Sequence, residues 1–441
     1  MTDIRYRSAI HVALAAAVVG ACSMGPLRAA TTPPPLISAP ITGPALMYPN
    51  PPVSIVPGAV SVDAFPYITE EYFVTGTANG APYVTRMIVR RPSDPDSFSG
   101  VVVSEAQHAG GRSLVFEWSR VSILTRRHMF VEIVHSAPNV ALMKTFNAGR
   151  YDRLAIAPGQ TNEIIAQVGR LIKSRVGPFA PYQVRYTTLM GTSASSGTVR
   201  NYLPAHASLR MPDEEPVFDG FLLTSTNGNE PLPIVDVPMI QMPTQTEVVT
   251  WAERGIAYRR PDSDAPGNRF RLYEVAGMPH NNSRESPAFA NDPCTVPVTD
   301  FPAGAFTALA LNHLIEWITK GTAPPHAPPI AVDRDPSNDG SHLALDEFGN
   351  AKGGVRNVWV DLPAATYGVF GKGKVPGQDR LCMLAGTEVP LPDQVLRRLY
   401  PTTNAYVTGV EQRLKELVAE GWFLPEYVEL VRLDVKKTRI P

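Results

Sequence analysis

Short runs of consecutive apolar residues alternate along this chain with longer segments in which apolar residues recur at helical spacing. The continuous runs are typical of strands buried on both faces, and they occupy residues 100–104, 128–136, 186–190, 220–224, 237–242 and 269–275. The segments with helical spacing occupy residues 112–124, 162–176 and 305–318. Strands that alternate with helices in this way predict an α/β fold, with a mostly parallel central sheet and helices on both faces.

Two further patterns lie on either side of this alternation. Residues 72–91 alternate apolar and polar positions around Asn79-Gly80, a pair that favours a tight β-hairpin. Near the end of the chain, residues 396–400 and 406–418 have the apolar spacing of amphipathic helices. We therefore expect an antiparallel hairpin before the parallel strands and a helical C-terminal region after them.

The stretch YTTLMGTSASSGTVRNYL (residues 186–203) combines a predicted strand, a run of small residues and a predicted helix. Ser193 lies at the centre of the small residues, in the sequence GTSAS. A strand, a sharp turn and a helix with a serine at the apex form the nucleophile elbow of α/β-hydrolases. The usual elbow reads G-x-S-x-G, and here Ser195 replaces the second glycine. An ordinary serine-rich helix N-cap is therefore the alternative interpretation.

Two candidate catalytic residues follow later strands. Glu247 comes just after the run 237–242, and His280 comes just after the run 269–275. The carboxyl ends of parallel strands meet at one edge of a sheet, where ligands bind. The order Ser193, Glu247, His280 is the order of nucleophile, acid and histidine in α/β-hydrolases. In such a triad the histidine takes the serine proton and the carboxylate orients the imidazole.

Both of these assignments have alternatives. His280 is one of nine histidines, and a histidine in a loop is often only a surface residue. Four other carboxylates are candidates for the acid, and turn-capping aspartates are common: Asp219, Asp236, Asp262 and Asp264. The position of Glu247 directly after its strand favours it as the acid.

An acyl-transfer site also needs backbone N–H groups that hold the oxyanion. We assign one to Ala194, the residue after the predicted nucleophile. The other comes from the loop EAQHAGG (residues 105–111), which follows the run 100–104, and we assign it to Gln107. An ordinary Gly-Gly turn is the alternative interpretation of this loop. His108 and Thr192, which adjoin these positions, are predicted to contact the substrate.

The first 30 residues have the form of an export signal. Arg5 and Arg7 precede an apolar segment, residues 9–21, that is too short to span a membrane. The sequence VGAC ending at Cys22 is similar to a bacterial lipobox, whereas residues 27–29 offer an ordinary cleavage site. We therefore expect an exported protein of the periplasm or outer membrane, either anchored to the membrane by a lipid on Cys22 or secreted. Residues 31–60 are Pro-rich and are expected to form a tether or an extended surface segment.

Composition and cysteine usage exclude several classes of protein. The 441 residues carry a formal net charge of −1, so the chain lacks the basic character of nucleic-acid-binding proteins. Cys294 and Cys382 are the two cysteines beyond the signal, and export permits a disulfide between them. They are not accompanied by clustered histidines, so we predict no metal site. The expected chemistry needs no cofactor.

Five segments, in order along the chain, resemble the secreted bacterial "alpha/beta hydrolase domain" proteins within the α/β-hydrolase superfamily. The segments are GVVVSEAQHAGGRSLVFEW, LMGTSASSGTVRNYLPA, VPMIQMPTQTEV, PDSDAPGNRFRLYEVAGMPH and FGNAKGGVRNVWVDLPAATY. This resemblance implies that Ser193 is the nucleophile, Glu247 the acid and His280 the base. Members of the family mostly carry aspartate at the acid position, glutamine where Ala194 stands and asparagine where Gln107 stands.

The motifs and the resemblance together predict an organisation and an activity. Residues 61–325 are expected to form an α/β-hydrolase core, and residues 326–441 a C-terminal extension packed on it. The expected activity is cleavage of a small-molecule carboxylic ester, with an amide as the second substrate class, through an acyl-serine intermediate. A catalytically inactive hydrolase-fold binding protein of the cell envelope is the alternative, because the elbow motif is imperfect and glutamate replaces aspartate.

Overall fold

The computed structural model describes residues 35–43, 46–48, 61–226, 228–334 and 341–441. The export signal, with Cys22 and both cleavage sites, lies outside these residues, as does most of the Pro-rich segment. Within that segment, Leu36–Ile37 forms an edge strand, β1, which pairs antiparallel with the next strand of the sheet.

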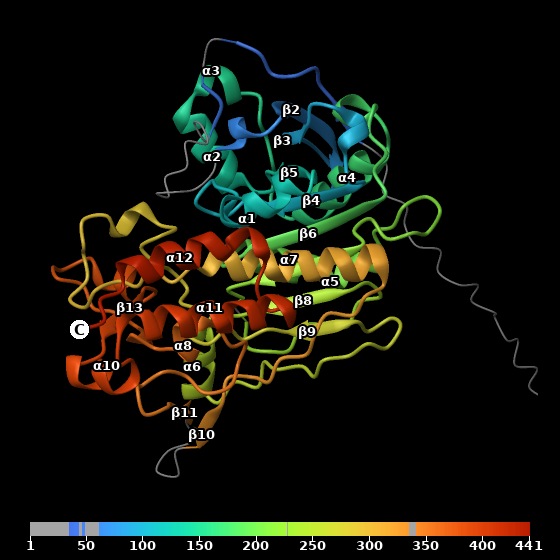
Figure 1. The fold of residues 1–441 in the computed structure, drawn as a ribbon. Helices are drawn as coiled ribbons and strands as arrows, with labels where there is room; N and C mark the ends of the chain where they lie inside the picture. Colours follow the sequence, from blue (N-terminus) through green and yellow to red (C-terminus); the bar gives the residue numbers. More distant parts are fainter. Residues whose placement is uncertain (1–34, 44–45, 49–60, 227, 335–340) are drawn as a thin grey trace, which may run out of the picture.

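A nine-stranded sheet forms the centre of the molecule (Figure 1), in the order β1-β2-β3-β5-β4-β6-β7-β8-β9. The strands after β1 are β2 (Tyr67–Ala78), β3 (Ala81–Pro92), β4 (Val101–Ala106), β5 (Met129–Ile133), β6 (Tyr186–Thr192), β7 (Gly220–Thr224), β8 (Met239–Met242) and β9 (Phe270–Leu272). All pairings from β5 to β9 are parallel. The prediction of a mostly parallel sheet is therefore confirmed, and the apolar runs become its buried strands.

The predicted hairpin is the antiparallel pair β2 and β3, joined by the two residues Asn79 and Gly80. Both have positive φ, 49° and 70°, which matches the right-handed twist of the flanking strands and favours Asn-Gly. Only residues 270–272 of the predicted strand 269–275 form a strand, β9. Beyond β9 the backbone of Glu274 and Ala276 bonds with Val355 of the C-terminal region, so the chain leaves the sheet there.

Helices cover both faces of the sheet. On one face α1 (Leu114–Thr125) packs beside α7 (Ala303–Lys320), and on the other α4 (Thr161–Lys173) packs beside α5 (Ala194–His206). Outside these layers lie α2 (Ala137–Phe146) and α3 (Ala148–Tyr151), while α6 (Gln245–Glu253) follows β8. The three predicted helices correspond to α1, α4 and α7, since their apolar positions fall on the faces that meet the sheet.

The C-terminal region lies against α7 and the ends of β8 and β9 (Figure 1). It contains α8 (Val358–Asp361), α9 (Asp379–Cys382), α10 (Asp393–Leu399), α11 (Thr403–Ala419) and α12 (Val428–Lys437). It also contains two small hairpins, β10 (Val332–Arg334) with β11 (Ser341–Leu343) and β12 (Ala365–Val369) with β13 (Gly386–Pro390). The two helices predicted here are α10 and α11.

Aromatic contacts join this region to the core. Trp359 and Phe423 of the C-terminal region pack against Phe306 of α7, and Trp359 also contacts Phe301 just before that helix. These four side chains are buried, so the C-terminal region shares a hydrophobic core with the sheet domain.

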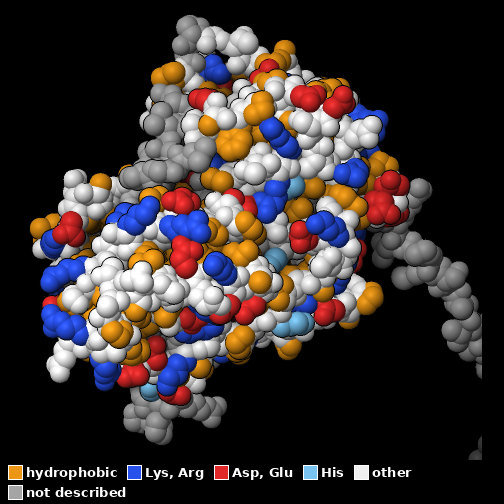
Figure 2. Space-filling model, viewed as in Figure 1, with side chains coloured by type: hydrophobic (Ala, Val, Ile, Leu, Met, Phe, Trp, Pro, Cys, Tyr) orange, Lys and Arg blue, Asp and Glu red, His pale blue; other side chains and the backbone are white. Residues whose placement is uncertain are grey.

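The surface carries mixed charge. On the face that Figure 2 displays, Lys and Arg side chains alternate with Asp and Glu side chains, in keeping with the net charge of −1. None of the described helices combines the length and the apolar character needed to cross a membrane.

Candidate active site

The turn between β6 and α5 holds Ser193 in a strained conformation. Ser193 has φ 51° and ψ −118°, a region that costs a non-glycine residue about 1–3 kcal/mol. Its N–H donates to the carbonyl of Thr224 at the end of β7 (3.1 Å), which fixes the turn to the neighbouring strand. A Cβ on Gly191 would lie 2.4 Å from the backbone oxygen of Ser195, so only glycine fits there. The backbone is therefore that of a nucleophile elbow.

Ser195, the residue that departs from the usual motif, forms hydrogen bonds across the inside of this turn. Its hydroxyl accepts a hydrogen bond from the Thr192 N–H and donates one to the Thr192 carbonyl, both at 2.9 Å. The side chain is buried, so these bonds satisfy backbone groups that have no access to water. The replacement of glycine by serine is thus accommodated by specific hydrogen bonds, a role that the sequence analysis did not anticipate.

Three side chains from the ends of three strands meet at the carboxyl edge of the sheet. His280 Nε2 lies 3.0 Å from Ser193 Oγ, and His280 Nδ1 lies 2.5 Å from Glu247 Oε1. With the imidazole proton on Nδ1, His280 donates to Glu247 and its Nε2 accepts from the Ser193 hydroxyl. The structure therefore brings the three residues singled out from the sequence into one hydrogen-bonded chain.

The second oxygen of Glu247 is held by the start of helix α6. Thr244, the N-cap, donates to Glu247 Oε2 from its backbone N–H (2.8 Å) and from its hydroxyl (2.7 Å). Glu247 occupies the third position of the helix, so the pair forms a capping box. The pattern T-x-x-E in TQTE (residues 244–247) is a readable signal for this contact, which the sequence analysis missed.

The competing carboxylates are engaged elsewhere. Asp219 pairs with Lys173, Asp236 pairs with His206 and Arg210, Asp262 pairs with His326, and Asp264 pairs with Arg271. Each of the four alternative carboxylates therefore already has a partner of its own, whereas Glu247 is the carboxylate that contacts His280.

Helix α6 also holds the histidine loop, which we define as residues 276–281. The Thr246 hydroxyl accepts from the His280 N–H (3.1 Å), and Gln245 Oε1 accepts from the Gly277 N–H (2.7 Å). The Gln245 N–H in turn donates to the Met278 carbonyl (2.8 Å). One helix end therefore orients both Glu247 and His280, through two residues, Gln245 and Thr246, to which the sequence assigned no role.

The electrostatic surroundings tune the two histidines near the elbow in opposite directions. Burial lowers the pKa of His280, but the charge and the hydrogen bond of Glu247 outweigh it, so the pKa is raised above its ordinary value. Burial, and then the positive charge of His280, lower the pKa of His108. Burial and the charge of His280 therefore both favour the neutral form of His108, whose Nδ1 accepts from the Gly110 N–H at 3.0 Å.

The predicted oxyanion donors differ in their placement. Ala194 begins α5, where the first N–H groups have no carbonyl partner within the helix and a developing negative charge is favoured. The Gln107 N–H instead donates to the Ile133 carbonyl (2.9 Å) and continues the pairing of β4 with β5. The assignment of Gln107 is thus corrected in this conformation, because its donor is already used within the sheet.

The two predicted substrate contacts also differ. His108 is half-buried and interacts electrostatically with His280, which places it beside the triad. Thr192 is 0 % exposed and lies inside β6 opposite Thr224, so its side chain does not reach the accessible site. The expectation for Thr192 is corrected for that reason.

A disulfide joins Cys294 to Cys382, 88 residues apart in sequence. It ties the segment between His280 and α7 to helix α9, and it packs with Phe289 and Ala385 in a small separate core. Among the described residues there is no group of three or more His, Cys, Asp or Glu side chains that could hold a metal ion.

The strand order, the elbow after β6, and an acid and a histidine after β8 and β9 define an α/β-hydrolase. Sequence comparison agrees: residues 25–432 match the family described as "Alpha/beta hydrolase domain", and the chain belongs to that family. The resemblance drawn from the five segments is therefore confirmed. No curated protein matches the chain.

Several solved hydrolases are similar to parts of the structure. Esterase Est22 is 9 % identical with a TM-score of 0.32, covering 47 % of this chain and 71 % of its own. LpqC, a poly(3-hydroxybutyrate) depolymerase from Bordetella parapertussis, is 11 % identical with a TM-score of 0.33, covering 59 % and 92 %. Oligopeptidase B from Leishmania major is 11 % identical with a TM-score of 0.29, covering 47 % and 33 %. Because these scores are low, the likeness carries no argument about function.

Proposed function

We propose that this protein is an exported serine hydrolase that cleaves a carboxylic ester through an acyl-serine intermediate. The observation that carries the proposal is the continuous chain from Ser193 Oγ to His280 Nε2 (3.0 Å) and from His280 Nδ1 to Glu247 Oε1 (2.5 Å). A serine hydroxyl becomes a strong nucleophile when a neutral imidazole is placed to take its proton. The distances are within hydrogen-bond reach.

The reaction would run in two halves. Ser193 Oγ bonds to the ester carbonyl carbon while His280 Nε2 takes the hydroxyl proton, and Glu247 stabilises the resulting imidazolium. The tetrahedral oxyanion lies at the start of α5, near the Ala194 N–H. The bond to the alcohol oxygen then breaks, and that oxygen takes the proton from His280. Water, activated by the same imidazole, releases the acid and restores Ser193.

A catalytically inactive binding protein is the second candidate, and one observation favours it. In the loop after β4, the backbone N–H of Gln107 donates to Ile133, and that of His108 donates to Arg112, both at 2.9 Å. An oxyanion hole normally takes its second donor from this loop. An active enzyme would need to supply it from another group or after a local rearrangement of this loop.

Export to the periplasm or the outer membrane is part of the proposal. The charged and apolar pattern of residues 1–30 supports it, with a lipid on Cys22 as one mode of anchoring. The bond between Cys294 and Cys382 supports it as well, because structural disulfides persist in oxidising compartments.

The test compares the mature protein with Ser193→Ala on p-nitrophenyl esters of increasing acyl length. A burst of p-nitrophenol followed by steady turnover, both lost in the variant, is the expected result. A fluorophosphonate probe should label the wild type on Ser193 and leave Ser193→Ala unlabelled. A folded wild type that neither turns over any ester nor reacts with the probe would favour the binding protein instead.

A further inference from the structure

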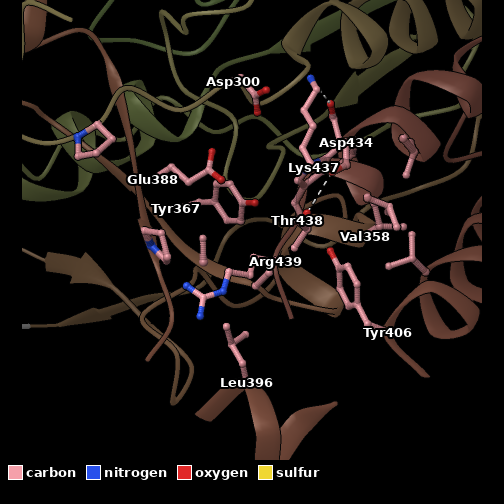
Figure 3. A pocket seen from close by; sticks show the side chains of 18 of the residues that line it. Asp300, Val358, Tyr367, Glu388, Leu396, Tyr406, Asp434, Lys437, Thr438 and Arg439 are labelled. Carbon is pink, nitrogen blue, oxygen red and sulfur yellow. Dashed lines mark hydrogen bonds and ion pairs between the residues drawn. The ribbon is translucent and has the colours of Figure 1, made fainter. Parts of the chain in front are cut away.

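A cavity of about 440 Å³ lies within the C-terminal region. Residues of β12, β13, α8, α10, α11 and α12 line it, together with the segment that precedes α7 (Figure 3). Its volume is in the range of sites for small organic molecules. Ser193, Glu247 and His280 are not among its lining residues.

Most of the wall is apolar or aromatic. The apolar and aromatic side chains include Val358, Trp359, Leu396, Tyr406, Val410 and Val431. A wall of this kind favours a ligand with an apolar body. Trp359 and Tyr406 are also aromatic, and the faces of aromatic rings attract positive charge.

Tyr367, on β12, contributes an unpartnered polar group to this wall. The residue is only 6 % exposed, yet its hydroxyl has no hydrogen-bond partner among the residues that the structure describes. Figure 3 shows this hydroxyl directed into the cavity. Burial, followed by the nearby acidic groups, raises the pKa of Tyr367 well above its ordinary value, so the hydroxyl stays neutral. The hydroxyl therefore presents a donor and an acceptor at the cavity wall, and a polar group of a ligand would pair with it.

Glu388, on β13, supplies a carboxylate beside Tyr367 (Figure 3). It accepts a hydrogen bond from the Thr299 hydroxyl (3.0 Å), and no cation among the described residues forms an ion pair with it. Burial, and then the charges of its acidic neighbours Asp300 and Asp434, raise the pKa of Glu388, although both neighbours pair with Arg284 (3.1 and 2.7 Å). The Glu388 carboxylate therefore has no cationic partner among the described residues, and a cation at the cavity wall would favour its charged form.

Two cations also reach the cavity, but each has an acidic partner. Lys437 Nζ lies 3.5 Å from Asp434, and an Arg439 nitrogen lies 3.8 Å from Asp393. Both side chains are mostly exposed, at 66 % and 82 %. Among the less exposed polar groups that line the cavity, Asp434 pairs with Arg284, whereas Glu388 and Tyr367 have no cationic partner among the described residues.

We propose that this cavity binds a small organic ammonium ion with an apolar body. The ammonium group donates to the Glu388 carboxylate and the Tyr367 hydroxyl oxygen, and the apolar body contacts the wall formed by α8, α10 and α11. This site is separate from the proposed hydrolase reaction, so its test does not depend on activity.

The test measures binding to the mature protein by titration calorimetry with three matched probes at neutral pH. Hexylammonium carries the charge and the apolar chain, hexanol has only the chain, and hexanoate has the opposite charge. We expect saturable binding of hexylammonium that is at least about tenfold tighter than that of either other probe, as a charge-assisted hydrogen bond provides.

Two variants locate the binding. Glu388→Gln removes the charge while keeping the shape, and it should weaken hexylammonium binding about tenfold. Tyr367→Phe should weaken it several-fold, and it provides an independent test if Glu388→Gln does not fold. Glu253→Gln, at an exposed position of α6, is the matched control and should bind as the wild type does.

Four results would overturn the proposal. They are the absence of hexylammonium binding, equal binding of all three probes, tighter binding of hexanoate, and unchanged hexylammonium affinity in Glu388→Gln. Equal binding would indicate an apolar cavity without charge recognition, and preference for hexanoate would assign recognition to Lys437 and Arg439.

Discussion

The Glu247 carboxylate lies against His280 with one oxygen and against the cap of helix α6 with the other. Oε1 is 2.5 Å from His280 Nδ1, while Oε2 accepts both hydrogen bonds of Thr244. The acid is therefore fixed by a helix end rather than by a flexible loop. A glutamate at the third helical position can reach both groups, which gives a physical reason for glutamate at this position.

Glu247 variants test this double role. Glu247→Gln should lower kcat/KM by about 10³- to 10⁴-fold, because the imidazole loses its orienting charge. Glu247→Asp keeps the charge but is one methylene shorter, so it cannot hold Thr244 and His280 together, and we expect an intermediate loss. Ester hydrolysis is the measurement, and Glu253→Gln on the same helix is the control. An aspartate variant as active as the wild type would contradict the argument about reach.

The pH dependence of kcat/KM should report His280. The neutral imidazole is the active form, so activity is lost as pH falls through its pKa, which Glu247 holds above the ordinary value. In Glu247→Gln, burial still lowers the pKa but the raising charge is gone, so the acidic limb should move to lower pH. The measurement is the residual activity of this variant across pH. The exposed variant His326→Gln should keep the wild-type pH profile. If the acidic limb does not move in Glu247→Gln, that limb reports the titration of a group other than His280.

Ser195 tests the closure of the elbow. Ser195→Ala leaves the Thr192 N–H buried without its partner, which should cost about 1–3 kcal/mol of unfolding free energy. Turnover should fall as well, since the strained conformation of Ser193 is held less firmly. Urea unfolding and ester hydrolysis measure the two effects, with the exposed Ser208→Ala as control.

Ser195→Gly separates the hydroxyl from the motif. It restores the usual G-x-S-x-G pattern but lacks the two hydrogen bonds, so we expect a stability no higher than that of Ser195→Ala. A glycine variant that is as stable and as active as the wild type would show that the hydroxyl has no role in the elbow.

The disulfide should contribute to stability through the long loop that it closes. Removing a native disulfide costs about 2–5 kcal/mol in small exported domains. The double variant Cys294→Ala with Cys382→Ala should therefore unfold at lower temperature, and a reductant should leave its Tm unchanged. Both cysteines are buried, so a reductant should lower the Tm of the wild type only slowly. Equal Tm values for the wild type and the double variant would contradict this prediction.

The sequence by itself determined the parallel strands of the sheet, the main helices that cover it and the order of the predicted catalytic groups. The run 220–224 became β7 with the same bounds, and Asn79-Gly80 became the turn of the hairpin. These features were readable because strand and helix periodicity, turn preference and the elbow motif depend on residues close together in the chain. No helix was predicted from the sequence for residues 428–437, which form α12.

The tertiary structure decided which groups are engaged and which are free. Five carboxylates were candidates for the acid, and the distance from Glu247 to His280 selected one of them. The Gln107 N–H was lost to Ile133, Ser195 gained a role inside the elbow, and Tyr367 and Glu388 came together in a cavity. Except for the bond from Ser195 to Thr192, these outcomes depend on partners distant in sequence, which a local pattern does not specify. Hydrogen-bond partners and buried charges are set only when the whole chain has packed.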